Sequence, residues 1–449
     1  MSAAGFLLEK FDQRSAETAV IWHEQSYDYH WLLGRFEHWR GVLKNEHIHP
    51  GQVVIFEAEF SPNSVALLLA LIECGCVVVP LTKSVRDKKA EFIDIARGEI
   101  MLFVDEHDLA SIERLSGKGD HEVYDRLREM SHPGLVLFSS GSTGKSKAAV
   151  HDFTAILEKF SVPRKAYRTI AFLLFDHIGG VNTLFYTLSN GGTLIVCEER
   201  SPDAVLTAIE RFRAELLPTS PTFINLILLS EAYRRHDLSS LKLVTYGTEA
   251  MPENTLKRFH SLFPQIQLAQ TYGLSEVGIL RAKSKSSDSL WVKIGGEGFE
   301  TRIVDGALQI KAKSAMLGYL NAPSPFTDDG WFITGDSVEV DGEYLKILGR
   351  KSELINVGGE KVYPCEVESI IQEFENVAEV SVYGEKNPLV GHIVCARVRL
   401  KQEDPSGDFA GRLKAFCRSR MQSYKVPVKV LLTSHSQYSE RYKKMRREP

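Results

Sequence analysis

The feature that most limits the fold of this chain is a regular alternation of short apolar runs with helical patterns. Residues 31–43 and 65–74 repeat apolar side chains at helical spacing, and residues 52–56 and 76–81 predict strands. The same rhythm predicts strands at 169–174, 193–196, 216–218, 243–246 and 266–269. Strands that alternate with helices favour parallel sheets covered by helices on both faces. The sequence therefore predicts an α/β protein.

The pattern changes in the second half of the chain. After Ser289, short alternating strands at 301–304 and 308–311, with glycine-rich turns between them, predict a smaller antiparallel unit. After Gly349 an α+β segment follows. Its expected elements are a helix at 364–374, strands at 377–383 and 392–400, and a helix at 411–421. A chain of 449 residues is too long for one small domain, and we expect a division into residues 1–348 and 349–449.

Composition excludes several classes of function. The net charge of −4 gives no indication of a nucleic-acid partner. No apolar run is long enough to cross a bilayer, and the first residues lack the basic start and apolar core of a secretory signal. The six cysteines are scattered without a Cys-x-x-Cys pair, which favours free thiols in a reducing compartment. We therefore expect a cytoplasmic protein that neither binds nucleic acid nor inserts into a membrane.

A loop of small residues follows the apolar run at 135–138. It consists of Ser139, Ser140, Gly141, Ser142, Thr143 and Gly144, with Lys145 and Lys147 directly after it. Hydroxyls and accessible backbone N–H groups suit a polyphosphate. The common G-x-x-x-x-G-K-[ST] phosphate loop needs glycine at position 139, where this chain has serine. Taken alone, the loop is also compatible with a surface turn that binds nothing.

This loop resembles the phosphate loop of the adenylate-forming superfamily, which comprises acyl- and aryl-CoA synthetases, peptide-synthetase adenylation domains and luciferases. The family pattern is T-S-G-[ST]-T-G-x-P-K-G, and this chain reads S-S-G-S-T-G-K-S-K-A. Lys147 falls on the family lysine, whereas Ser146 replaces proline and Ala148 replaces the last glycine. The resemblance implies that Ser139 to Gly144 and Lys147 bind ATP, and that Thr143 takes part in catalysis.

Two further segments resemble the family's nucleotide-binding motifs. In residues 243–250, Gly247, Thr248 and Glu249 match the turn that lines the adenine pocket. The Y-G-x-T-E motif corresponds to residues 270–276, whose candidate ATP-binding residues are Thr271, Tyr272, Gly273, Ser275 and Glu276. By this match Tyr272 stacks on adenine, Ser275 lies near the α-phosphate, and Glu276 takes part in catalysis by holding Mg²⁺. A carboxylate suits this hard cation, which prefers oxygen ligands.

Asp336 and Arg350 match the family's ribose-binding positions. Asp336 ends the sequence T-G-D, and Arg350 belongs to the long match G-R-K-S-E-L-I-N-V-G-G-E-K-V-Y-P-C-E-V-E. Unpaired surface charges are the simpler alternative for both. In the same segment Ser352 stands at the family's hinge position, and Gly358 and Gly359 would open a path for the thiol acceptor.

The end of the chain and the acid pocket leave two choices open. Aligning the family's final G-K-[IV]-x-R makes Lys444 the lysine that catalyses adenylation, with Lys443 as the competing choice and a solvated basic tail as the alternative. His177 matches the H-[IV]-x-G motif of CoA ligases and becomes a candidate catalytic residue of the acid pocket. Its spacing to Gly191 suits the smaller members, including o-succinylbenzoate–CoA ligases. A rival alignment places Asp176 where amino-acid adenylation domains hold the substrate amine.

The resemblance covers nearly the whole chain and implies both a fold and a function. The expected fold is a large N-terminal domain of helix-flanked sheets with a small β-barrel-like unit, followed by a mobile α+β C-terminal lid. The expected reaction uses ATP and Mg²⁺ to convert a small-molecule carboxylic acid to acyl-AMP, and then transfers the acyl group to coenzyme A. One alternative acceptor is the phosphopantetheine of an acyl carrier protein. A second alternative is a non-catalytic nucleotide-binding relative.

Overall fold

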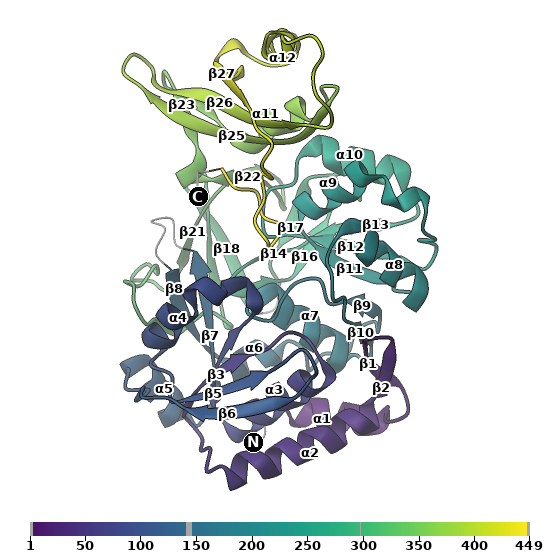
Figure 1. Ribbon diagram of the computed structural model, residues 1–449. Helices are drawn as coiled ribbons and strands as arrows, with labels where there is room; N and C mark the ends of the chain where they lie inside the picture. The colour runs from purple at the N-terminus through teal and green to yellow at the C-terminus, as the bar shows by residue number, and fades with distance from the viewer. Residues whose placement is uncertain (1–2, 141–145, 297, 447–449) are drawn as a thin grey trace.

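The computed structural model describes residues 3–140, 146–296 and 298–446. Figure 1 shows α1 and α2 at the base of the molecule and a C-terminal unit with α11 and α12 at the top. The helices are α1 (Gly5–Gln13), α2 (Tyr29–Asn45), α3 (Pro62–Cys74), α4 (Lys89–Ala96), α5 (Glu122–Met130), α6 (Phe153–Glu158), α7 (Ile178–Ser189), α8 (Pro202–Phe212), α9 (Pro221–Ser230), α10 (Glu253–Leu262), α11 (Pro364–Ile371) and α12 (Phe409–Arg418).

The first sheet has the strand order β20-β8-β7-β4-β3-β5-β6. Its strands are β3 (Val53–Glu57), β4 (Val77–Leu81), β5 (Ile100–Val104), β6 (Ala110–Arg114), β7 (Gly134–Ser140), β8 (Ser146–Asp152) and β20 (Gly318–Tyr319). The neighbours from β7 to β5 run parallel, and the remaining pairs are antiparallel. Every residue of β4 is buried, as expected for a strand covered on both faces.

The second sheet has the order β13-β12-β11-β9-β10-β1-β2, and all its pairs are parallel except β1 with β2. Its strands are β1 (Thr18–Trp22), β2 (Gln25–Asp28), β9 (Arg168–Ile170), β10 (Thr193–Ile195), β11 (Leu216–Thr219), β12 (Leu243–Tyr246) and β13 (Gln267–Gln270). The register pairs Tyr246 with Gln270, so Gly247 and Thr271 leave this sheet at the same edge. Ligands of open α/β sheets bind at such carboxyl ends.

Helix α3 shows how local signals and burial agree. The Ser61 hydroxyl accepts from the Ser64 N–H at its start, Pro62 fits the first turn, and Gly75 ends it at φ 80°. The residues from Pro62 to Ile72 are all buried. Its apolar side chains belong to one core with Val54 of the first sheet and Leu194 of the second. The helix therefore holds the two sheets together.

The remaining strands form a hairpin and two smaller sheets. Strands β14 (Tyr272–Leu274) and β15 (Gly278–Leu280) form the hairpin. An antiparallel sheet of order β16-β17-β22-β21-β19-β18 contains β16 (Ala282–Ser284), β17 (Trp291–Ile294), β18 (Phe299–Val304), β19 (Ala307–Ala312), β21 (Phe332–Asp341) and β22 (Tyr344–Arg350). The C-terminal sheet contains β23 (Ile355–Val357), β24 (Glu360–Val362), β25 (Val377–Asn387), β26 (Gly391–Leu400) and β27 (Lys429–Leu432).

These elements confirm the predicted α/β class, and the antiparallel sheet corresponds to the predicted β-barrel-like unit. The strand expected at 169–174 is wrong in length, because β9 ends at Ile170. A Cβ atom added to Gly180 would lie 1.9 Å from the Leu174 carbonyl oxygen. Residues 171–174 therefore pack against the start of α7 instead of extending the sheet.

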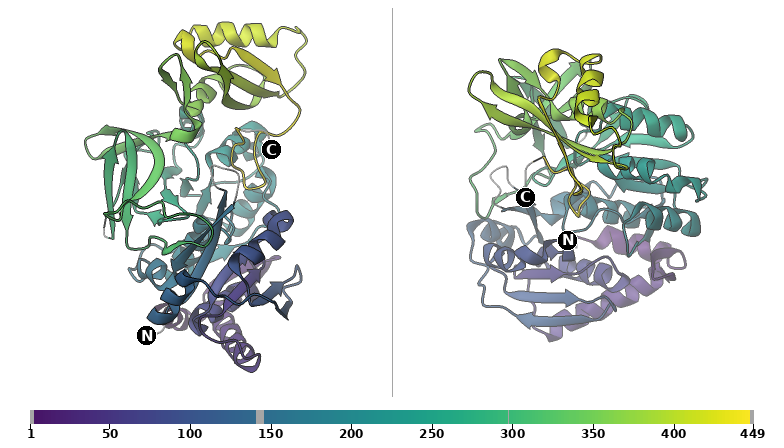
Figure 2. Two further views of the ribbon diagram at one scale, coloured as in Figure 1. Left: turned by 90° about the vertical axis from the view of Figure 1, so that its left-hand side faces the viewer. Right: turned by 45° about the horizontal axis from the view of Figure 1, so that its top comes forward.

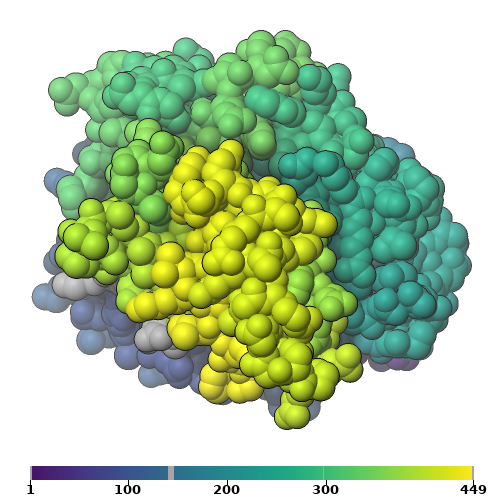
Figure 3. Space-filling model, turned by 90° about the horizontal axis from the view of Figure 1, so that it is seen from above, coloured from purple at the N-terminus to yellow at the C-terminus, as the bar shows by residue number. Residues whose placement is uncertain are grey.

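The last residues of the chain leave the C-terminal sheet and return to the larger part of the molecule. Figure 2 shows this yellow segment descending from α12 and β27 between the other elements. From above, the C-terminal sheet and helices cover the middle of the face in Figure 3. Within the described ranges, no helix combines the length and apolar character needed to cross a membrane.

Candidate active site

The described residues of the predicted phosphate loop belong to the end of β7 and the start of β8. The antiparallel register pairs Ser139 with Lys147 and Ser140 with Ser146. Gly141, Ser142, Thr143 and Gly144 lie outside the described residues. The Lys147 ammonium stands 5.2 Å from the ring centroid of Tyr319, which places this lysine beside the next group of the site.

Glu276 connects the phosphate-loop strand with the β14–β15 hairpin. Its Oε1 atom accepts a hydrogen bond from the Tyr319 hydroxyl at 2.7 Å and a longer one from Ser139 at 3.4 Å. Burial and the Glu276 carboxylate raise the pKa of Tyr319, so the phenol stays a donor. Oε2 has no hydrogen-bond partner among the described residues. Sequence reasoning missed Tyr319, because nothing local to Gly318–Tyr319 indicates its pairing with β8.

Tyr272, Asp336 and Arg350 form a second polar group. The Tyr272 hydroxyl donates to Asp336 Oδ2 at 2.5 Å, and Arg350 Nε lies 3.5 Å from Asp336 Oδ1. The register of β21 with β22 pairs Asp336 directly with Arg350. Burial raises the pKa of Asp336, although Arg350 opposes that shift. The structure thus brings the predicted ribose pair together, while stacking of Tyr272 on adenine stays a prediction.

The predicted adenine turn is tightly constrained. A Cβ atom on Gly247 would lie 2.6 Å from Thr271 Oγ1, so this close approach requires glycine. Thr248 adopts φ 74°, a strained backbone conformation for a β-branched residue. A Cβ atom on Gly273 would lie 2.6 Å from the Gly278 carbonyl oxygen, because the β14–β15 hairpin is equally tight. Ser275 is buried in the same hairpin.

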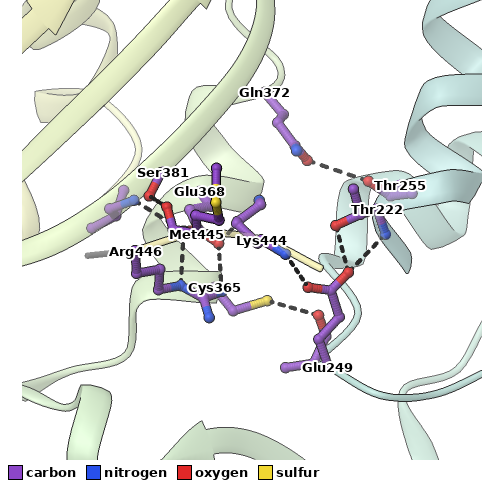
Figure 4. Close-up of polar contacts among 12 residues, drawn as sticks. Thr222, Glu249, Thr255, Cys365, Glu368, Gln372, Ser381, Lys444, Met445 and Arg446 are labelled. Carbon is purple, nitrogen blue, oxygen red and sulfur yellow. Dashed lines mark hydrogen bonds and ion pairs between the residues drawn. The ribbon is translucent and has the colours of Figure 1, made fainter. Parts of the chain in front are cut away.

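Glu249, by contrast, is engaged by two other segments. Its Oε1 atom accepts from the Thr222 N–H at 2.9 Å and the Thr222 hydroxyl at 2.5 Å. Its Oε2 atom accepts from the Lys444 N–H at 3.0 Å. Figure 4 shows this carboxylate between α9 and the C-terminal segment. In this arrangement Glu249 joins the end of the chain to the N-terminal sheets.

The C-terminal segment forms a narrow hairpin, in which Tyr438 pairs with Lys444 and the Ser439 N–H donates to the Lys443 carbonyl oxygen at 2.9 Å. At its tip, Arg441 Nη2 lies 2.6 Å from Asp176 Oδ2. Tyr442 donates to the Arg200 carbonyl oxygen at 2.5 Å. We call residues 438–444 the C-terminal hairpin. Because Asp176 already forms an ion pair with Arg441, the rival interpretation of Asp176 as a substrate-amine ligand gains no support here.

The two candidate lysines of this hairpin point in different directions. The Lys443 ammonium lies 3.2 Å from His177 Nε2, at the start of α7. The Lys444 ammonium lies 3.2 Å from Glu368 Oε2, on α11 of the C-terminal unit. Lys443, the competing choice from the sequence, is therefore the lysine that reaches the predicted acid pocket. The Lys444 ammonium pairs with Glu368 instead of His177, so the catalytic role predicted for Lys444 stays a prediction.

Electrostatics accentuate this difference. Burial and the nearby Arg441 and Arg350 lower the pKa of Lys443 to about 8. The positive charge of Lys443, together with burial, lowers the pKa of His177, so the imidazole is neutral and can accept from the ammonium. Burial alone would raise the pKa of Glu368, but Arg446 and Lys444 lower it to about 2. Figure 4 shows Lys444 and Arg446 meeting at Glu368.

Gly358 and Gly359, predicted near the acceptor thiol, lie in the exposed turn between β23 and β24. They adopt φ 61° and 95°, and a Cβ atom on either would contact nothing within 4 Å. The structure does not bring them to the polar groups described above. Their predicted role at the thiol acceptor stays a prediction.

A cavity of about 960 Å³ reaches the predicted nucleotide-binding residues at Thr271. It is lined by Thr271, by the α7 residues Asn182, Thr183, Tyr186 and Thr187, and by Ile279 of β15. Lys159 lines it as well, and its ammonium donates to Asn182 Oδ1 at 2.7 Å and to the Ile279 carbonyl oxygen at 2.9 Å. A cavity of this size suits a small organic molecule. Sequence reasoning missed Lys159, which carries no motif.

Comparison with known proteins identifies the class. Residues 7–313 match the AMP-binding enzyme family and residues 366–437 match the AMP-binding enzyme C-terminal domain, so the chain belongs to this family of AMP-binding enzymes. The predicted membership of the adenylate-forming superfamily is thereby confirmed.

Similar proteins of known activity include CoA ligases. An indoleacetate–CoA ligase of Aromatoleum aromaticum is 27% identical, with 92% of this chain and 91% of the relative covered. A feruloyl-CoA synthase of an Amycolatopsis species is 26% identical, with 87% of each covered. The crystal structure of the anthranilate CoA ligase AuaEII with anthranoyl-AMP has a TM-score of 0.84 at 19% identity, covering 99% of this chain and 96% of that one. This last likeness supports the fold.

Proposed function

We propose that this chain is an AMP-forming acid–thiol ligase, which activates a carboxylic acid with Mg·ATP and transfers the acyl group to coenzyme A. The contact of Lys443 with His177 carries the proposal, because it sets a C-terminal lysine at the head of the helix that lines the cavity. Family membership supports the adenylation step, and the CoA ligases among the relatives favour coenzyme A as the acceptor.

In the first step, a carboxylate oxygen of the acid forms a bond to the α-phosphorus of ATP. The bond from that phosphorus to the bridging oxygen breaks, and pyrophosphate leaves with the electron pair. The carboxylate is already a nucleophile, so the barrier arises from bringing anions together and from charge growing on the phosphate. Lys443 would stabilise that charge, Glu276 would hold the Mg²⁺ that accompanies ATP, and Asp336 would accept from the ribose hydroxyls.

In the second step, the thiolate of coenzyme A attacks the acyl carbonyl carbon and AMP leaves with the electron pair of the broken C–O bond. Lys443 contacts His177 through a hairpin whose root lies in the C-terminal unit. Moving residues 349–449 as a lid would withdraw the lysine and free space for the thiol. Ser352, in the connecting turn Lys351–Glu353, would be the hinge.

The decisive test is acid-dependent exchange of pyrophosphate into ATP across a panel of aryl, fatty and amino acids. We expect exchange with at least one class, and a CoA thioester by mass spectrometry once coenzyme A is added. A product formed only with a phosphopantetheinylated carrier protein would establish the alternative acceptor. Binding of ATP without exchange for any acid would contradict the proposal and favour a nucleotide-binding relative without catalysis.

A further inference from the structure

The cavity is surrounded by basic side chains. Among the described residues that line it, Glu158 is the sole carboxylate. Its basic lining residues are Lys159, Arg164, Arg281, Lys283, Lys293 and Lys313. Lys293 pairs with Glu343 at 2.6 Å, but within the described ranges the other five have no carboxylate partner. This excess of positive charge surrounds a cavity that meets the predicted nucleotide-binding residues at Thr271.

Lys159 is the least exposed of these cations and the best positioned. Asn182 and the Ile279 carbonyl oxygen take two of the three donors that an ammonium offers. The third donor has no partner within the described part of the chain. Burial, reinforced by Arg164, lowers the pKa of Lys159 to about 7, and a negatively charged partner would reverse that shift. An anionic group in the cavity would therefore be stabilised at this ammonium.

The cavity connects Lys159 with the predicted nucleotide-binding residues. Thr271 lines it, and so does Ile279, whose carbonyl oxygen accepts from Lys159. The register of β14 with β15 pairs Ile279 with Gly273, two residues after Thr271. Phe160, Ile279 and Leu280 add apolar lining. The cavity therefore suits an acid with an apolar middle and polar groups at both ends.

Building on the proposed function, we infer that the substrate is a dicarboxylic acid, whose distal carboxylate pairs with Lys159 while its other carboxylate reacts at the end of the cavity lined by Thr271. An acid with an apolar tail would instead bury the Lys159 amine against hydrocarbon, which is unfavourable without a hydrogen-bond partner. The exposed Lys283 and Lys313 and the half-buried Arg281 would attract the dianion to the cavity.

The test compares matched acids with the full-length protein. Affinities of heptanedioate against heptanoate, and of 3-(4-carboxyphenyl)propanoate against 3-phenylpropanoate, are measured by isothermal titration calorimetry. Pyrophosphate exchange is measured with the same acids. We expect at least one diacid to bind about 10- to 100-fold more tightly than its monoacid, the range expected of a hydrogen bond between charged groups. Lys159→Met should abolish that preference by weakening diacid binding, and it should strengthen monoacid binding because no amine is then buried against the hydrocarbon tail.

Two further variants keep the result interpretable. Lys159→Arg retains the charge and should retain part of the preference, which separates charge recognition from misfolding. Lys118→Met removes an exposed lysine remote from the cavity lining and should leave both affinities unchanged. Circular dichroism checks that each variant is folded.

The outcomes separate this inference from the proposed function. Equal affinity for diacid and monoacid, or no measurable binding of either, would overturn the inference even if some monoacid supports exchange. A diacid preference that depends on Lys159, but without exchange, would support the binding site and contradict the proposed chemistry. A Lys159→Met defect confined to the coenzyme A step would overturn the inference in favour of a phosphate site for the acceptor.

Discussion

The root and the tip of the C-terminal hairpin contrast two ways of burying a carboxylate. At the root, the Glu368 carboxylate is fully buried and accepts hydrogen bonds from Lys444, Arg446 and the Val382 N–H. At the tip, Asp176 Oδ2 accepts hydrogen bonds from Arg441 and Thr82. Its buried Oδ1 atom has no hydrogen-bond partner in the described residues. The side-chain contacts of Glu368 join residues within the C-terminal unit, and those of Asp176 join that unit to the N-terminal sheets. The comparison indicates that the root is a permanent anchor and the tip a contact that can be released.

The largest effect is expected from breaking the root. Glu368→Ala leaves two cations and a backbone N–H without their acceptor, which should reduce the free energy of unfolding of the C-terminal unit by about 3–5 kcal/mol. Denaturant unfolding followed by circular dichroism measures this change. Glu373→Ala is the control, because its ion pair with Arg420 is exposed on both sides and should contribute no more than about 1 kcal/mol. Equal losses in both variants would show that the root is no special anchor.

The next largest effect is expected in catalysis, where replacing Lys443 should slow the reaction far more than replacing Lys444. Lys443→Met should slow acid-dependent pyrophosphate exchange by about 10²- to 10³-fold, as expected when a group that stabilises transition-state charge is lost. Thioester formation from supplied acyl-AMP should remain. Lys444→Met serves as the matched variant and should reduce exchange by less than about 10-fold. A larger loss from Lys444→Met would restore the choice made from sequence.

Weakening the tip should release the hairpin. Asp176→Asn removes the charge that holds Arg441, so trypsin should cut at residues 441–444 about 10-fold faster, consistent with losing one charged hydrogen bond. Mass spectrometry of timed digests measures the rate. Asp237→Asn removes an exposed carboxylate that pairs with Arg213 and should leave that rate unchanged. Protection that persists in Asp176→Asn would show that other contacts hold the tip.

The smallest expected effect is a difference in pH dependence between catalysis and the binding of the C-terminal hairpin to the N-terminal sheets. We call this binding docking. Docking lowers the pKa of Lys443 to about 8, so the released lysine binds its proton more tightly. Docking therefore becomes more favourable as pH rises from about 8 towards the ordinary lysine range. The ammonium needed for adenylation is lost over the same interval, so kcat/KM for ATP should fall above pH 8 while trypsin protection does not. Lys443→Arg should shift the fall to higher pH, and a parallel loss of protection would contradict this explanation.

Local patterns in the sequence predicted most of the fold, because helices such as α2 and α3 depend on apolar periodicity and end signals that lie within a few residues. The choice between Lys443 and Lys444 could not be predicted in this way. Neighbouring residues of an extended segment point to opposite faces, and a shift of one residue exchanges them. Only the pairing of Tyr438 with Lys444 fixes which lysine faces His177.

The remaining site residues depend on contacts between distant segments. Asp336 and Arg350 were predicted from motifs, but their contact results from the register of β21 with β22. Tyr319 reaches Glu276 only because β20 adds to the edge of the first sheet. Lys159 acquires its role from α7 and β15, which lie far along the chain. Contacts between segments that are far apart in the sequence leave no local pattern from which they could be predicted.

Arg350 is the last residue of β22, and the turn Lys351–Glu353 that leads to the C-terminal sheet begins at the next residue. A ribose whose hydroxyls donate to Asp336, as in the proposed function, would compete with Arg350 for the same carboxylate. Under the proposed function, nucleotide binding would therefore change the contact of the residue directly before the connecting turn, and would link occupancy of the site to the position of residues 349–449.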